Sequence, residues 1–176
     1  MKERQVIALA KASLGDAAVL AEMNRQMIVD EGYKEKLNLS RLRKRMRDWL
    51  RLGEYEAVFF LDNENSRIGY ALFQKQEDAL FFAKRQVFLR HFFIARSHRR
   101  RGVGTQAFKV LKEELWKGAD RVDLRVLIQN RSAVNFWHHL GFKEYQFGME
   151  LKIRPPSLDV RGSYKGKRTV RSITEA

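Results

Sequence analysis

"SHRRRGVGTQA" (residues 97–107) is the stretch that decides how the chain is interpreted, because a run of arginines leads into a glycine pair and a helix-like segment. Glycine lets the backbone come close to a ligand. The amides of Gly102, Val103, Gly104 and Thr105 would stand at a helix start, where they lack intrahelical partners and attract anions. The stretch contains neither a Walker loop nor a dinucleotide G-x-G-x-x-G sequence. It therefore predicts another kind of phosphate-binding turn or a plain glycine turn.

The segments around this turn alternate between strand and helix patterns. Upstream, the expected elements are a strand at 5–10, helices at 14–32 and 40–53 (N-capped by Ser40), strands at 55–62 and 66–74 joined by "NENS", and a long strand within 79–95 after a turn near Lys84. Downstream they are a helix at 102–118, a strand at 121–128, a helix at 132–140 and a last strand at 142–153. A strand–helix–strand unit with a long helix requires a parallel strand pair, so we expect an α/β chain with a mixed sheet.

The charge of the chain is strongly positive, at +14 with a pI near 10.3. The basic residues gather in 41–51, in 84–101 and in a C-terminal segment. Such a field attracts nucleic acid, acidic proteins or a phosphorylated cofactor, although each cluster could equally be a solvated surface. The sequence contains no cysteine and no apolar run of spanning length. We expect no leader peptide, because Lys11 interrupts the short apolar run near the start. We therefore expect a cytoplasmic protein without membrane insertion.

Two motifs together resemble the Gcn5-related N-acetyltransferases (GNAT). The R-x-x-G-x-G of residues 99–104 follows an apolar strand and opens a helix, as the pyrophosphate loop of that family does. About 30 residues further on, "NRSAVNFWHHLGF" matches the family pattern N-x-x-A-x-x-x-(aromatic)-x-x-x-G-F from Asn130 to Phe142. "MNRQMIVDEG" is also similar to the first helix of an uncharacterised bacterial GNAT group.

The resemblance implies a GNAT-like domain over 4–153 and leaves 154–176 as a weakly ordered basic tail. It implies a mostly antiparallel sheet with a parallel, splayed central pair, flanked by about four helices. It also implies acetyl-CoA as the cosubstrate and no metal. The implied cofactor contacts are Phe93, Ile94, Arg99, Arg101, Gly102, Val103, Gly104, Thr105, Asn130, Ala133 and Phe136.

Individual roles follow from the same resemblance. The loop amides, with Arg99 and Arg101 nearby, would hold the pyrophosphate, and the strand end 92–94 would pair with the pantetheine arm. Asn130 would bond the pantetheine amides, or it is simply the N-cap of the helix that contains Ala133. The Phe92 amide would polarise the thioester carbonyl. The family's tyrosine acid is replaced by Trp137, whose indole does not titrate.

Direct attack on the thioester requires a neutral amine and hence a base, because an alkylamine has a pKa near 10. The base candidates are Glu31, Glu56, His91 and Asp123, each with a purely structural alternative. Strand alternation places Arg90 on the face of Phe92 and Ile94, with His91 opposite. Arg90 could then anchor an acidic group of the acceptor or cap the sheet edge.

Two functions fit these patterns. The first is acetyl-CoA-dependent transfer of an acetyl group to a primary amine of a small molecule or protein. The second is a basic nucleic-acid- or ribosome-binding module on the same fold with little turnover. In either case the basic tail would attract an anionic partner, and the hairpin and basic helix are compatible with a homodimer.

Overall fold

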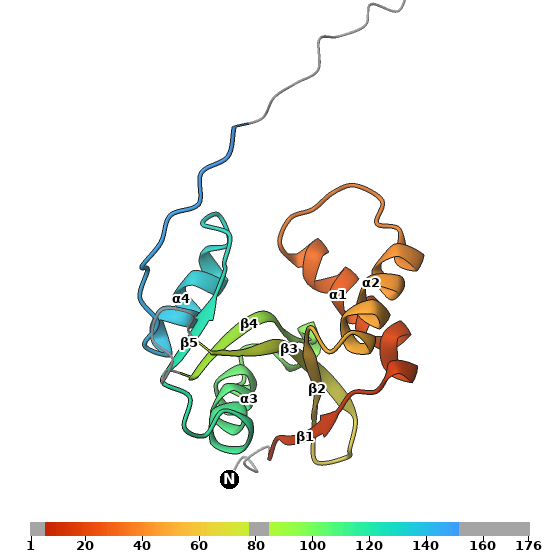
Figure 1. The fold of residues 1–176 in the computed structure, drawn as a ribbon, viewed down its shortest axis with the longest axis horizontal. Coiled ribbons are helices and arrows are strands. Elements are labelled where there is room, and N and C mark those ends of the chain that lie inside the picture. The colour runs from red at the N-terminus through yellow and green to blue at the C-terminus, as the bar shows by residue number, and fades with distance from the viewer. Residues whose placement is uncertain (1–5, 78–84, 152–176) are drawn as a thin grey trace, which may run out of the picture. The chain divides into compact units, whose positions relative to one another are not determined.

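In the part of the chain that the structure describes, five strands form one mixed sheet in the order β1-β2-β3-β4-β5 (Figure 1). The computed structural model describes residues 6–77 and 85–151. The strands are β1 (Ala8–Lys11), β2 (Glu56–Leu61), β3 (Arg67–Glu77), β4 (Arg85–Ile94) and β5 (Arg121–Leu124). The first four pair antiparallel, and β4 pairs with β5 in parallel. The mixed, mostly antiparallel sheet expected from the sequence and its family resemblance is confirmed. The parallel pair, however, lies at the edge of the described sheet and not at its centre, because β5 is its last strand.

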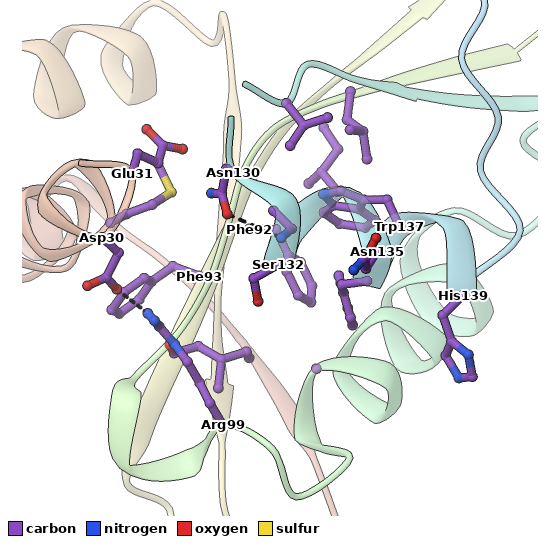
Figure 2. A pocket seen from close by; sticks show the side chains of 18 of the residues that line it. Asp30, Glu31, Phe92, Phe93, Arg99, Asn130, Ser132, Asn135, Trp137 and His139 are labelled. Carbon is purple, nitrogen blue, oxygen red and sulfur yellow. Dashed lines mark hydrogen bonds and ion pairs between the residues drawn. The ribbon is translucent and has the colours of Figure 1, made fainter. Parts of the chain in front are cut away.

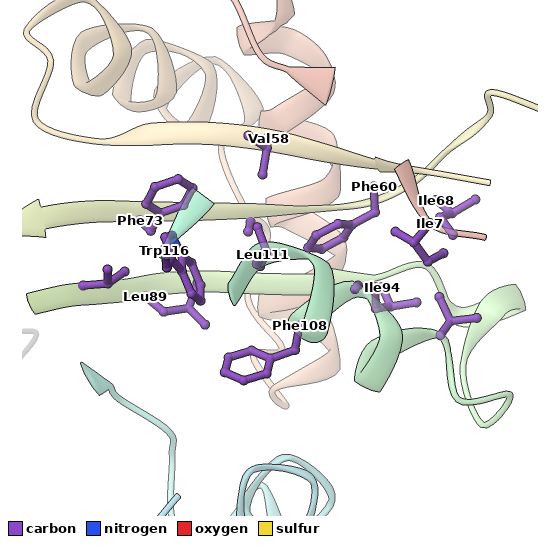
Figure 3. Packing of buried hydrophobic residues seen from close by; sticks show 14 of the residues in the cluster. Ile7, Val58, Phe60, Ile68, Phe73, Leu89, Ile94, Phe108, Leu111 and Trp116 are labelled. Carbon is purple, nitrogen blue, oxygen red and sulfur yellow. The ribbon is translucent and has the colours of Figure 1, made fainter. Parts of the chain in front are cut away.

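Among the described residues, four α-helices cover the two faces of this sheet. They are α1 (Ala17–Asp30), α2 (Leu39–Arg51), α3 (Val103–Val110), which continues as the π-helix Leu111–Leu115, and α4 (Arg131–His139). α1 and α2 bury Leu20 and Met46 against one face, whereas α3 buries Leu111 against the other (Figures 1 and 3). β2 is accordingly apolar on both sides, as Val58 and Phe60 face α3 while Ala57 and Phe59 face α1.

A β-bulge in β4 changes which way Arg90 points. Leu89 pairs with Phe73 and His91 with Leu72, so Arg90 is the extra residue. The Arg90 guanidinium lies over the Trp49 ring of α2, on the α1–α2 face of the sheet. The expectation that Arg90 shares the face of Phe92 and Ile94 is therefore wrong, because the bulge interrupts the alternation. His91 does lie opposite Phe92, as expected.

The last expected strand is also absent from the described residues. From Lys143 to Leu151 the chain forms no strand, and Phe147, Met149 and Leu151 are largely exposed. This segment belongs to a second unit, Lys143–Ala176, separate from Met1–Phe142. The alternating pattern alone does not make a strand, because the backbone also needs a neighbouring strand to pair with.

Smaller differences concern the ends of elements. Asn38 rather than Ser40 caps α2, since its carboxamide oxygen accepts from the Arg41 amide at 3.0 Å. β5 stops at Leu124, four residues before the end of the strand predicted at 121–128. The expected hairpin joins β2 to β3. The turn near Lys84 and the tail 154–176 lie outside the described residues. In the described ranges no helix is long and apolar enough to cross a membrane.

Candidate functional site

The site lies where β4 continues past the end of β5. The parallel pairing ends at Leu89–Leu124, although β4 runs on to Ile94. The Ala95 amide donates to Ile68 of β3 at 2.8 Å. Because backbone groups alternate in direction along a strand, those of Phe92 and Ile94 point away from β3, towards the gap left by β5. A cavity of about 660 Å³ opens there, lined by β4, β5, α1, α3 and α4.

The glycine turn closes one side of this cavity. Gly102 is the N-cap residue of α3 and has a φ of 78°, a left-handed conformation that favours glycine. Gly104 faces α4, and a Cβ placed there would come within 3.2 Å of the Phe136 ring. Gly102, Gly104 and Thr105 all line the cavity. The start of α3 therefore presents backbone amides to it at close range.

α4 forms the opposite wall. Asn130 caps this helix, as its side-chain oxygen accepts from the Ala133 amide at 3.2 Å. Asn130 therefore has the N-cap role that the sequence analysis gave as the alternative to cofactor binding, and it also lines the cavity. Arg100 of the glycine turn reaches Ser132 of α4, with Nη2 3.4 Å from Oγ.

An aromatic cluster supports the floor of the cavity. The Phe92 ring stacks on Phe136 with centroids 5.8 Å apart and meets Trp137 edge-on at 5.3 Å. Trp137 also packs against Phe108 and Phe142 and is only 8% exposed. Trp137 is thus a packing residue that fixes the position of Phe92 and Phe136.

Asp30, at the end of α1, joins that helix to the arginines that follow β4 (Figure 2). Its carboxylate accepts from Arg96 Nε at 2.6 Å and also from Arg99. Burial alone would raise the pKa of Asp30, but the hydrogen bonds and charges of Arg96 and Arg99 outweigh it and lower the pKa. Arg99 additionally donates to the Ile94 carbonyl at 2.6 Å. Arg99 thus holds α1 and β4 together while it lines the cavity.

Glu31 follows Asp30 and lines the same cavity (Figure 2). Burial raises the pKa of this carboxyl, and the negative charge of Asp30 raises it further. A carboxylate with a raised pKa is a stronger base at neutral pH than an ordinary one. Among the base candidates, Glu31 therefore has the most suitable environment.

The other base candidates are used elsewhere. His91 is buried, lies 3.0 Å from the Tyr70 hydroxyl through Nδ1, and has a pKa lowered to about 3, first by burial and then by the charges of Arg45 and Arg90. Glu56 pairs with Lys75 at 3.2 Å, and Asp123 pairs with Arg121 at 2.7 Å. None of the three lines the cavity.

Most of the residues proposed from the sequence meet at this cavity. They are Glu31, Arg90, Phe92, Phe93, Ile94, Arg99, Gly102, Gly104, Thr105, Asn130, Ala133 and Phe136. Glu56, Arg101 and Val103 do not line it, as Arg101 is exposed and the Val103 side chain is buried in the core. Further lining residues that were not proposed from the sequence include Met27, Arg100, Arg125, Ser132, Asn135 and His139. The sequence signal that could have identified several of them is that they lie next to residues of the two motifs.

The described sheet, mostly antiparallel with one parallel pair that ends early beside a helix opening on glycines, has the arrangement of a GNAT-like acetyltransferase fold. The family model "Acetyltransferase (GNAT) family" matches residues 22–142, and the chain belongs to this family. The resemblance noted in the sequence is thereby confirmed.

Solved structures of other acetyltransferases share the fold. A possible acetyltransferase from Clostridium difficile 630 superimposes with a TM-score of 0.69 at 16% identity, covering 85% of this chain and 99% of the other. A predicted acetyltransferase with acetyl-CoA from Clostridium acetobutylicum gives 0.64 at 16%, covering 84% and 96%. The ribosomal-protein-alanine N-acetyltransferase of Brucella melitensis biovar Abortus 2308 gives 0.66 at 12%, covering 84% and 100%. Identities this low establish the fold alone. No curated protein sequence matches the chain.

Proposed function

We propose that the protein transfers the acetyl group of acetyl-CoA to a primary amine by direct attack of the amine on the thioester. The supporting observation is a single cavity that carries the amides of a glycine-opened helix at one side and the half-buried Glu31 at the other. The first group suits a pyrophosphate and the second suits an amine that must lose a proton.

The residues around the cavity fit the cosubstrate. The amides from Gly102 to Thr105 would receive the pyrophosphate, and Arg100, which lines the cavity, would add charge. The backbone of Phe92 and the amide of Ile94 would pair with the pantetheine arm, since β5 leaves that edge of β4 open while the Ile94 carbonyl already accepts from Arg99. Bound acetyl-CoA supplies the activated acyl group. Gly104 keeps the passage between α3 and α4 free of a side chain.

Proton transfer is assigned to Glu31. Its carboxylate would accept the proton that the amine loses, while the Phe92 amide would donate a hydrogen bond to the thioester carbonyl. Trp137 is buried and cannot serve as the acid. The leaving thiolate, with a pKa near 8.5 for an ordinary thiol, would take its proton from water.

Calorimetry with acetyl-CoA tests the cofactor half of this proposal. Thr105 is exposed and lines the cavity, so Thr105→Glu places a negative charge beside the α3 amides. We expect the wild type to bind acetyl-CoA and Thr105→Glu to bind at least about tenfold more weakly. Gly15→Glu adds the same charge at a remote, exposed position and should bind as the wild type does. A wild type that does not bind acetyl-CoA contradicts the proposal.

A panel of amines, amino acids and peptides, assayed by release of the coenzyme A thiol, then tests the amine half. A basic nucleic-acid-binding module remains the second candidate, because Arg41, Arg43 and Arg47 of α2 are exposed.

A further inference from the structure

Arg90 lines the cavity, contacts α2, and forms no ion pair with any residue that the structure describes. Its guanidinium carbon is 4.9 Å from the Trp49 ring centre and 5.6 Å from that of Tyr55, and the residue lines the cavity. The bulge in β4 produces this direction, since a regular strand would turn Arg90 to the other face. In the described ranges no carboxylate lies within ion-pairing distance of it.

A second guanidinium stands at the same indole ring. Arg45 of α2 lies 5.0 Å from the Trp49 centroid and donates through Nη2 to the buried Asn24 Oδ1 at 2.7 Å. Its Nε is buried and has no partner in the described chain. Burial lowers the pKa of Arg45, and the charge of Arg90 lowers it further. Arg45 likewise has no carboxylate within ion-pairing distance among the described residues.

Two cations held at one ring without an acid repel each other, and the burial of Arg45 weakens their screening by water. An anion bound at Arg90 would relieve this repulsion. The contrast with Arg96 and Arg99 is informative, since both of those guanidinium groups share Asp30. Among the described residues, Arg96 and Arg99 thus share a carboxylate, whereas Arg90 and Arg45 have none.

The cavity also contains an acidic group. Glu31 lines the same cavity as Arg90, without forming an ion pair with it. An acceptor that places its amine at Glu31 can thus place a second group at Arg90. The planar guanidinium has a fork of N–H donors that fits the two oxygens of a carboxylate.

We propose that the acceptor is an amine that also carries a carboxylate, and that Arg90 binds this carboxylate. Arg45, which contacts the same Trp49 ring, adds positive potential. This inference rests on the proposed acetyl transfer and adds the substrate class. The carboxylate could belong to a free amino acid or to an acidic side chain of a peptide, and both present the same group to Arg90.

Matched acceptors test the proposal. A series of ω-amino acids of increasing chain length is compared with the corresponding ω-amino carboxamides, so that the result does not depend on one spacing. Peptides with Glu or Gln at the second or third position form the other arm. We expect the best carboxylate acceptor to exceed its carboxamide about tenfold or more in kcat/KM. A preference confined to the first series identifies free amino acids, and one confined to the second identifies acidic peptides.

Variants then assign the preference to Arg90. Arg90→Gln should reduce the ratio of carboxylate to carboxamide to near one, mainly through KM, and Arg90→Lys should retain part of it. Arg43→Gln is the matched control, because it removes one exposed positive charge from α2 at a residue that does not line the cavity. Thermal unfolding of each variant confirms that it folds.

The outcomes separate this inference from the proposed function. Acetyl transfer to both members of each pair at equal rates overturns the carboxylate inference and leaves the acetyltransferase intact. A preference that survives Arg90→Gln, or that falls equally in Arg43→Gln, overturns the assignment to Arg90. No transfer to any amine overturns both proposals.

Discussion

Asp30 and Glu31 are adjacent acidic residues whose pKa values move in opposite directions. Two arginines hold Asp30 ionised, whereas burial and the Asp30 charge favour the protonated form of Glu31. When neighbouring carboxyl groups are separated in this way, one serves as a fixed charge and the other can exchange a proton. The same sequence, "DEG", therefore provides a structural anchor and a base, which no composition rule distinguishes.

Glu31→Gln is expected to lower kcat. At neutral pH it should also remove a half-buried charge that destabilises the folded protein. Loss of a general base costs about 100-fold or more in kcat. The raised pKa means that the folded protein binds this proton more tightly than the unfolded chain does. The free energy of unfolding contributed by Glu31 therefore falls as pH rises from 4.5 through the raised pKa, and it stays low at pH 7. Glu31→Gln should remove this dependence of the free energy of unfolding on pH, as measured by urea unfolding at pH 4.5 and at pH 7.

Asp30→Asn is the control, because the pKa of Asp30 is lowered whereas that of Glu31 is raised. The lowered pKa of Asp30 gives stability that is present above its ordinary value of 3.8 and is lost as pH falls through the lowered one. Asp30→Asn should destabilise the protein at pH 7, because Arg96 and Arg99 lose their shared partner. If Glu31→Gln is instead less stable than the wild type at pH 7 and equally active, Glu31 is a structural residue.

At the scale of elements, the sequence predicted what local patterns determine. Hydrophobic periodicity located α1 to α4 and the β2–β3 hairpin, and the glycine motif located the start of α3. It did not predict the bulge at Arg90, which depends on the register between β3 and β4. Nor did it predict that Asp30 would meet Arg99, 69 positions away. Such contacts are decided by packing between distant segments, on which local periodicity carries no information.

The close approach of β3 and β4 at Gly69 allows a test of this register. Gly69 pairs with Ile94, and a Cβ there would lie 2.1 Å from the Phe93 carbonyl oxygen. Gly69→Ala must therefore displace the end of β4, whose backbone borders the cavity. We expect a loss of about 1–3 kcal/mol in the free energy of unfolding, measured with urea, together with weaker acetyl-CoA binding.

Gly15→Ala is the corresponding control. Its Cβ would meet only Ser13 Oγ, at an ordinary 3.5 Å. This variant should stay within about 0.5 kcal/mol of the wild type. Equal stability of the two variants would show that β4 moves without cost, and the cavity edge would then be less fixed than the register implies.

At the scale of the molecule, the net charge of +14 is larger than the two positive charges of Arg90 and Arg45 that the acidic acceptor would use. Arg41, Arg43 and Arg47 of α2 are exposed and form no ion pair in the described ranges. We define these three residues as the exposed α2 arginines. Together with the basic tail, they would raise the local concentration of an anionic partner of the enzyme.

This charge predicts salt-sensitive binding to single-stranded nucleic acid, measured by fluorescence anisotropy from about 50 to 200 mM salt. The salt slope is the change in the logarithm of the binding constant with the logarithm of the salt concentration. Replacing the three exposed α2 arginines by Gln should lower the magnitude of this slope by about one for each arginine that contacts a phosphate. Deletion of 157–176 should reduce it as well, without affecting acetyl-CoA binding. Replacing Lys109, Lys112 and Lys117 by Gln removes the same charge from exposed positions elsewhere. Equal effects of the two triple variants would mean that only net charge matters, and absence of binding at the lowest salt would contradict an anionic macromolecular partner.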